Sequence, residues 1–309
     1  MQLQGVHHIT MITRDARRTV AFYADVLGLR LVKKTVNFDA PEAYHLYFGD
    51  EQGSPGSLLT WFEFVGIQQG RAGAGMIHTI KLRVASPDSL RFWADRLAQA
   101  EHPSEEHQHS LTFQDHDGLR LQLVLADQDS LPLRAEHPQI PPQHAISGVQ
   151  GASAYVLRGP QGDARLLTET LGFTQTGEGS WSLQGRGARF SWSCEISAQR
   201  GIQGAGTVHH IAWHCPDEDH VAWRRHVAEA GMHVTPIIDR SYFKSIYFRE
   251  PQGILFEIAT TSPGFAVDED PQHLGEHLCL PEQHQHLRTQ LERLLTPIVN
   301  PRSAAAEQR

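Results

Sequence analysis

The chain has 309 residues, 40% of them hydrophobic, and a formal net charge of −8 at pH 7. This composition supplies one large domain or two ordinary ones, and its even spread of apolar residues argues against a long disordered region. The acidic balance, with no block of Lys or Arg, argues against nucleic acid and anionic membranes as partners. It favours a small neutral or weakly acidic ligand.

The first residues run directly into a predicted strand, without the basic and apolar regions of a signal peptide, and no apolar run is long enough to span a bilayer. The three cysteines are too scattered for a disulfide framework. These features predict a soluble, cytoplasmic protein with reduced cysteines.

The first 65 residues predict a βαβββ unit. Asp15 can cap a helix, and Gly28 stands where a helix C-terminus favours glycine. An apolar stripe lies between them. The predicted elements are a strand at 5–12, a helix at 15–27 and strands at 29–38, 44–48 and 57–64.

The same order of elements returns further along the chain. Residues 73–80 align with residues 204–211 and share five identities, and Leu27-Gly28 is echoed by Leu171-Gly172. We therefore predict an α+β fold of four βαβββ modules. The second module has predicted elements at 76–84, 87–100 and 119–125, the third and fourth begin with strands at 149–157 and 208–214, and the modules cover about 5–65, 72–127, 146–197 and 204–262.

A proline-rich segment divides the chain. Residues 131–145 contain four prolines and predict a linker without regular structure. The predicted domains are therefore 1–130 and 146–265. The remaining tail, 266–309, contains one predicted amphipathic helix around 285–295 that could cover the core or a partner subunit, which leaves a homo-oligomer open, and residues after Pro301 are expected to fray.

Two histidine pairs interrupt strands that would otherwise be apolar. His7 and His8 lie between Val6 and Ile9, and His209 and His210 recur in the same context. A strand that places two histidines where Val or Ile would fit has given up apolar burial, and this favours metal ligation. Glu257 interrupts the last apolar strand of the fourth module. Two histidines and one glutamate form a facial triad.

The repeat itself indicates which histidine of each pair is the ligand. Neighbouring strand residues face opposite ways, so one histidine per pair should point into the site. The second module keeps His78 at the position of His7 but has lost both the second histidine and the glutamate, so we choose His8 and His210. At the histidine position, modules two and three carry Thr79 and Gly151. At the glutamate position, modules one, two and three carry Thr60, Gln122 and Ser191.

Only the first and fourth modules carry ligands, and this predicts how the modules pair. The metal must lie between modules one and four, so these two should pair in space although they are far apart in sequence. Modules two and three should then pair with each other. The predicted assembly is two open barrel-like units.

Several strings of residues resemble a known family. The paired βαβββ modules, the helix Phe22-Tyr23-Ala24-Asp25-Val26-Leu27-Gly28-Leu29 and the His and Glu ligands resemble the vicinal oxygen chelate superfamily, which includes glyoxalases, bleomycin resistance proteins and extradiol dioxygenases. Residues 31–38, 44–48 and 238–250 are similar to the hydroquinone-type ring-cleaving dioxygenases. The resemblance covers nearly the whole chain.

The resemblance implies the vicinal oxygen chelate fold, a mononuclear Fe(II) or Mn(II), and opening of a dihydroxylated aromatic ring by O2. It implies that the metal ligands are His8, His210 and Glu257. It also implies that Thr10, His209, Arg240 and Tyr247 line the substrate side, with His7 close by.

Three protein ligands leave open metal positions for O2 and a substrate oxygen. Related lyases and isomerases usually place a second acid where this chain has Thr60, so its absence favours a dioxygenase. His209 could act as the acid/base group, and Arg240 and Tyr247 could hold the second hydroxyl. An extradiol catechol dioxygenase, a metal-dependent isomerase or lyase and a metal-free resistance module remain alternatives.

Overall fold

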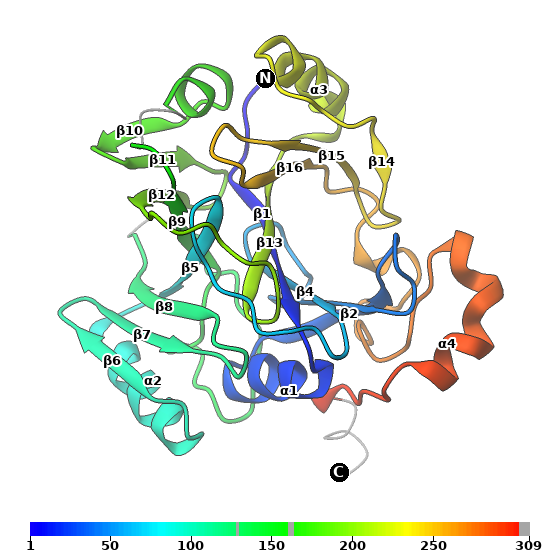
Figure 1. Cartoon of the computed structure of the whole chain (residues 1–309). Coiled ribbons are helices and arrows are strands. Elements are labelled where there is room, and N and C mark those ends of the chain that lie inside the picture. The colour runs from blue at the N-terminus through cyan, green and yellow to red at the C-terminus, as the bar shows by residue number, and fades with distance from the viewer. Residues whose placement is uncertain (128–129, 160–163, 303–309) are drawn as a thin grey trace.

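The computed structural model describes residues 1–127, 130–159 and 164–302. Its strands form two eight-stranded sheets that lie beside each other (Figure 1). The first sheet combines the two ends of the chain. Its strands are β1 (Val6–Thr13), β2 (Arg30–Val36), β3 (Tyr44–Gly49), β4 (Leu58–Glu63), β13 (Thr207–His214), β14 (Ile238–Asp239), β15 (Lys244–Arg249) and β16 (Leu255–Ala259), in the spatial order β14-β15-β16-β13-β1-β4-β3-β2.

The second sheet is built from the middle of the chain and has the same plan. At its centre the first strands of two modules pair antiparallel, as β1 and β13 do in the first sheet. Its strands are β5 (Met76–Val84), β6 (Ser104–His107), β7 (Ser110–Gln114), β8 (Arg120–Leu125), β9 (Val149–Val156), β10 (Thr174–Gly177), β11 (Ser180–Gln184) and β12 (Arg189–Ile196), in the order β10-β11-β12-β9-β5-β8-β7-β6.

One helical segment follows the first strand of each module. This arrangement confirms the predicted α+β fold of four βαβββ modules. It also confirms the predicted pairing of module one with module four and of module two with module three. The segments are α1 (Ala16–Val20) with η1 (Ala21–Val26), α2 (Pro87–Gln99), η3 (Leu166–Thr170), and η4 (Asp217–Asp219) with α3 (His220–Glu229).

Each sheet takes one module from either side of the proline-rich segment. The predicted domains, 1–130 and 146–265, therefore do not coincide with the two sheets. The division of the chain into these two domains stays a prediction. Within residues 131–145 the structure has no named helix or strand, as predicted. Ile140 of this segment is buried and lies against the Cα of Gly28.

The first helix differs from its prediction in its winding. Asp15 caps it as expected, because the Arg18 amide donates a hydrogen bond to the Asp15 carboxylate. The helix then widens to a π-helix from Ala21, where the Leu27 amide donates to the carbonyl of Phe22. The third module repeats this widening between Leu171 and Leu166. Apolar periodicity alone did not indicate this change of winding.

The C-terminal tail covers one end of the first sheet (Figure 1). The prediction of one continuous helix was wrong, because the segment winds as the 3-10 helix η6 (Glu282–Leu287) and then as α4 (Arg288–Leu294). Leu291 and Leu295 are buried in the core, so the tail packs on its own chain. Another 3-10 turn, η5 (Phe265–Val267), precedes it. The predicted fraying after Pro301 falls mostly on residues 303–309, outside the described residues.

Among the described residues, no helix combines the length and apolar character needed to cross a membrane.

Gly275 places the tail against β2, and its substitution should destabilise the fold. Its φ is +73°, and a Cβ there would lie 2.1 Å from the carbonyl oxygen of Leu31. Gly66 has a similar φ of +79° but open space around it. We expect Gly275→Ala to lower the free energy of unfolding by about 2–4 kcal/mol in urea denaturation, against about 1–2 kcal/mol for Gly66→Ala, which suffers backbone strain alone. Equal losses would contradict a tight contact at Gly275.

Candidate metal centre and substrate cavity

The two histidine pairs lie at irregularities of the central β1–β13 ladder. The register shifts between Val6 and His8 on β1, so His7 is the extra residue there. A second shift on β13 makes His209 the extra residue, because Thr10 pairs with His210 and Met11 with Val208. Such bulges re-aim side chains that strict alternation would point away. Both histidines of each pair therefore stay near the site.

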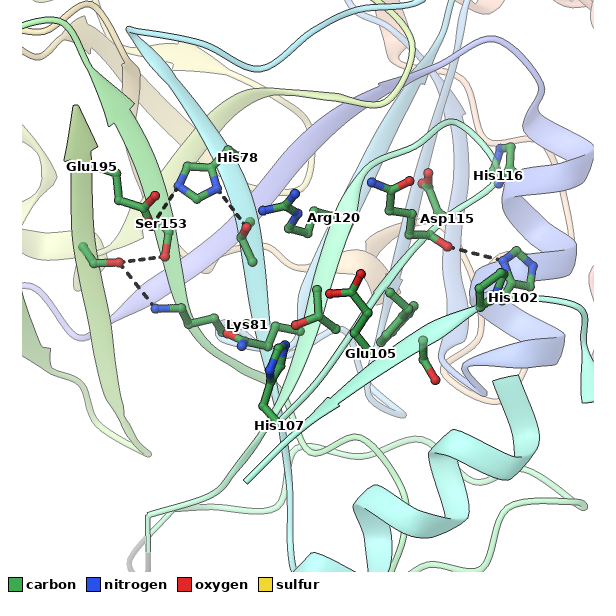
Figure 2. Close-up of a pocket in the computed structure, with 18 residues that line it drawn as sticks. His78, Lys81, His102, Glu105, His107, Asp115, His116, Arg120, Ser153 and Glu195 are labelled. Atoms are coloured by element: carbon green, nitrogen blue, oxygen red, sulfur yellow. Dashed lines mark hydrogen bonds and ion pairs between the residues drawn. The ribbon is translucent and has the colours of Figure 1, made fainter. Parts of the chain in front are cut away.

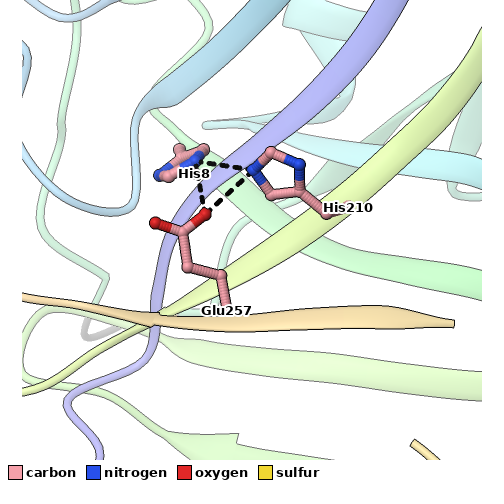
Figure 3. A group of neighbouring side chains, drawn as sticks. All are labelled: His8, His210 and Glu257. Carbon is pink, nitrogen blue, oxygen red and sulfur yellow. Dashed lines mark hydrogen bonds and ion pairs between the residues drawn. The ribbon is translucent and has the colours of Figure 1, made fainter. Parts of the chain in front are cut away.

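His8, His210 and Glu257 meet between β1, β13 and β16 (Figure 3). His8 Nε2 lies 3.2 Å from His210 Nε2. The Glu257 carboxylate oxygen Oε2 lies 3.4 Å from His8 Nε2 and 2.9 Å from His210 Nε2. All three side chains are buried. The sequence-predicted ligands thus converge, although His8 lies more than 200 residues from the other two.

These residues fit a divalent metal ion. The buried Glu257 Oε2 has no well-directed hydrogen bond, although two ring nitrogens face it. Glu257 Oε1 accepts a short hydrogen bond from Ser245 Oγ, which fixes the carboxylate. Two imidazole nitrogens and one carboxylate oxygen are the donor set of a facial triad, which suits Fe(II) with open positions.

Electrostatics at the centre also favour an ionised carboxylate beside a neutral His210 ring. Burial by itself raises the pKa of Glu257, but His8 and His210 hold this pKa well below its usual value. Burial lowers the pKa of His210, and His8 lowers it further, against the opposing effect of Glu257. A cation would thus find an ionised carboxylate and a neutral His210 nitrogen, the forms that bind metals.

The remaining histidines of the two pairs orient the ligand rings. His7 Nδ1 lies 2.9 Å from His8 Nδ1, and His209 Nδ1 lies 2.8 Å from His210 Nδ1. Each bond occupies the ring nitrogen that faces away from Glu257. Such outer hydrogen bonds fix the ring orientation and tautomer of metal-binding histidines. His7 therefore contacts the ligand set from behind.

A cavity of about 360 Å³ opens above the histidines. His209, Arg240 and Tyr247 line it, as the resemblance implied. Arg240 Nε donates a hydrogen bond of 3.2 Å to the Tyr247 hydroxyl, and Arg240 also reaches the exposed Asp39 at 3.2 Å. The volume of the cavity suits a small aromatic ligand. The aromatic part of the wall is formed by Phe38, Tyr47, Phe62, Phe64, Phe243 and Tyr247.

Thr10 lies beside the metal-facing nitrogen of His210. It is fully buried, and it is absent from the described cavity wall. Its hydroxyl lies 2.9 Å from His210 Nε2 and 2.8 Å from the Thr60 hydroxyl. Thr10 thus supports His210 from within the sheet, and Thr60, where related lyases carry an acid, is engaged in the same network.

His45 belongs to the site but received no role from the sequence. It lines the cavity, and its Nε2 lies 3.1 Å from the Thr60 hydroxyl. The Tyr47 hydroxyl lies 2.9 Å from His45 Nδ1. The available signal was a histidine within the apolar strand 44–48. Hydrogen bonds therefore connect Tyr47, His45, Thr60 and Thr10 to His210.

One equivalence from the internal repeat needs correction. Glu257 pairs with Ala212 beside the central strand, and the corresponding pair in the third module is Ser193 with Ser153. Ser193, and not Ser191, therefore occupies the glutamate position. Counting from the turn glycine failed because the turn before β12 differs in length from that before β16.

Comparison with known proteins assigns the family. The model of the Glyoxalase/Bleomycin resistance protein/Dioxygenase superfamily matches residues 5–123 and 160–258. The chain is 40% identical to MhqO of Bacillus subtilis (strain 168), which is named as a ring-cleaving dioxygenase, over 95% of this chain and 96% of that protein. It is 30% identical to a chlorohydroquinone/hydroquinone 1,2-dioxygenase of Sphingobium indicum, over 96% of this chain and 98% of that enzyme.

Solved structures agree with this fold. A crystal structure of a Bacillus subtilis protein described as a dioxygenase has a TM-score of 0.90 and 40% identity, covering 96% of this chain and 98% of that one. Glyoxalase I from Zea mays, at 13% identity and a TM-score of 0.61, covers 88% of this chain and 96% of that one and shows the shared fold alone. The chain therefore belongs to the glyoxalase/bleomycin resistance protein/dioxygenase superfamily and, within it, to the ring-cleaving dioxygenases.

Proposed function

We propose that this enzyme opens the ring of a hydroquinone-type aromatic diol with O2, using Fe(II) or Mn(II) held by His8, His210 and Glu257. The convergence of these three side chains below an aromatic-walled cavity carries the proposal. The relative named chlorohydroquinone/hydroquinone 1,2-dioxygenase supports the choice of substrate class. Cytoplasmic location and assembly into a homo-oligomer stay predictions.

The protein groups around the cavity can bind and orient the diol. The metal ion, when bound, supplies a Lewis-acidic centre with open positions for a phenolate oxygen and O2. The aromatic wall can hold the ring by stacking and edge contacts. Arg240 and Tyr247 can then donate hydrogen bonds to the hydroxyl at the far end of the ring.

His209 is placed to accept a proton from the diol, because it lines the cavity. Burial lowers its pKa to about 3, with further lowering by His210 and Arg249, so its ring is neutral at pH 7. A base with so low a pKa holds a proton weakly. Its position in the cavity wall, and not its pKa, therefore supports the role of general base that we assign to His209.

The substrate panel that tests this proposal compares para-diols with ortho-diols. A catechol can chelate a metal through both oxygens, whereas a hydroquinone offers one oxygen and needs protein donors at its far hydroxyl. Because Arg240 and Tyr247 supply such donors, we expect kcat/KM to favour hydroquinone by about tenfold or more. O2 uptake with ring-opened product would be followed on both substrates. Equal or better turnover of catechol would contradict the hydroquinone proposal and favour an extradiol catechol dioxygenase.

An anaerobic assay separates the other enzyme class. A metal-dependent isomerase or lyase would use the same ligands without consuming O2. For this enzyme we expect no turnover when O2 is removed and recovery when it is returned. Loss of activity upon chelation, restored by Fe(II) or Mn(II), would identify the working metal. Sustained anaerobic turnover would favour the isomerase or lyase.

A further inference from the structure

The second sheet carries a cleft at the place equivalent to the metal centre (Figure 2). The central ladders match in both sheets, since Ile9 pairs with Ile211 in one and Ile80 with Ala152 in the other. The cleft has a volume of about 810 Å³ and opens over β5, β7, β8, β9 and β12. None of the groups described above as metal, substrate or second-sphere residues of the first sheet lines it.

This cleft has lost the metal triad. Thr79 stands at the position of His8, Gly151 at that of His210 and Ser193 at that of Glu257. A Cβ at Gly151 would lie 2.1 Å from the Ser191 hydroxyl and 2.4 Å from its carbonyl oxygen. The backbone therefore closes the second histidine position to any side chain. Among the described residues, no metal-binding group of His, Cys, Asp and Glu lies in this cleft.

A lysine extends into the region that the ligands vacated. Lys81 stands at the position of Thr10, pairs with Gly151 across the ladder and lines the cleft. Its ammonium lies 3.4 Å from Ser193 Oγ, at the glutamate position (Figure 2). Among the described residues, this is the one hydrogen bond given for the Lys81 ammonium. An ammonium has three N–H donors, so two stay available to a ligand.

Uncharged polar groups lie beside this ammonium, and the exposed Glu195 carboxylate lies 3.6 Å from the neighbouring His78 Nε2. His78 is 8% exposed, lines the cleft, and its Nε2 makes no hydrogen bond. Burial lowers the pKa of His78 to about 4, so the ring is neutral at pH 7. The hydroxyls of Thr79 and Ser153 are also buried at the cleft. The deep part of the cleft therefore combines one cation with neutral hydrogen-bonding groups.

The rim carries charges of both signs. Arg120, Glu105 and Glu195 are exposed there. The two acids repel a ligand that carries a second negative charge, such as phosphate at neutral pH. A single carboxylate can instead reach Lys81 and leave the rest of its molecule near the rim.

We propose that this metal-free cleft binds a small organic monocarboxylate, with Lys81 holding the carboxylate and His78 donating or accepting a further hydrogen bond. A charge-assisted hydrogen bond from a half-buried ammonium is stronger than one between neutral groups. The ring-opened acid expected from the proposed function belongs to this ligand class, but the proposal stands on the cleft alone.

The test measures binding of 2,4-hexadienoate, a six-carbon unsaturated monocarboxylate, by isothermal titration calorimetry at fixed ionic strength. The uncharged analogue 2,4-hexadien-1-ol tests whether the ligand must carry a negative charge. Inorganic phosphate tests whether the site prefers a different anion. We expect Lys81→Met to weaken hexadienoate binding by at least about tenfold and Lys81→Arg to retain most of it. Lys244→Met removes the same charge from an exposed strand position and should leave binding unchanged.

Two further measurements keep the site assignment independent of the metal centre. Hexadienoate bound at the metal would be lost in Glu257→Ala, whereas binding at Lys81 should persist there. Thermal melting checks that the Lys81 variants are folded. Wild-type affinity in Lys81→Met, equal binding of the alcohol, or tighter binding of phosphate would overturn the proposal.

Discussion

Replacing Glu257 by alanine is expected to abolish both metal content and ring cleavage. Glu257 is fully buried and supplies the one carboxylate of the triad. Two histidines alone cannot fix the coordination geometry. The loss of affinity should exceed the roughly 10–100-fold that removal of a hydrogen bond to a metal-binding residue costs. Metal content per chain after anaerobic loading, together with O2 uptake, provides the measurement.

The internal repeat supplies a matched control for this variant. Gln122 occupies the equivalent strand position in the second module and donates a hydrogen bond to Ser110 Oγ. Gln122→Ala should therefore leave metal content and turnover unchanged, although it alters the same kind of position in the same fold. Full metal occupancy in Glu257→Ala would exclude the proposed triad. Loss of metal in both variants would point to a general folding defect.

Replacing Arg240 by alanine is expected to lower kcat/KM for hydroquinone by about 1–3 kcal/mol. Arg240 is the permanently charged donor of the cavity wall, and its guanidinium lies 5.3 Å from the Tyr247 ring centre. The variant loses a charged hydrogen bond to the substrate and leaves the Tyr247 hydroxyl without its partner. Steady-state kinetics on hydroquinone, with metal content measured in parallel, tests this effect.

The ion pair of Arg240 provides the control. Asp39 is exposed and contacts Arg240 at 3.2 Å, so Asp39→Ala removes this partner and spares the guanidinium. Exposed ion pairs contribute little, and we expect at most a small change in kcat/KM. An equal loss in Asp39→Ala and Arg240→Ala would show that the ion pair, and not contact with the substrate, causes the effect. Unchanged kinetics in Arg240→Ala would remove it from the proposed substrate site.

Local patterns determined the modules and their pairing. The apolar spacing of each strand, the cap at Asp15 and the glycine at Gly28 predicted βαβββ units with boundaries close to those observed, because these signals depend on a few neighbouring residues. The repeat then limited the ligand positions to the first and fourth modules. A site built from both requires that they share one sheet, as they do.

The sequence pattern of a single strand could not predict features that depend on contacts between distant segments. The bulges that bring His7 and His209 beside the ligand histidines arise from the pairing of β1 with β13. Thr10 contacts the metal-facing Nε2 of His210, and its hydroxyl also meets Thr60 of a neighbouring strand. The C-terminal segment winds as a 3-10 helix before its α-helix, and Leu291 and Leu295 pack against the core.

The sequence by itself determined the fold class, the four modules and the identity of the three residues that meet at the candidate metal centre. Tertiary structure decided which groups surround them. His45 enters the site through hydrogen bonds to side chains of neighbouring strand positions, and Lys81 enters the second cleft from the strand position that pairs with Gly151. Periodicity reports which face a residue occupies, whereas these contacts depend on the register between strands.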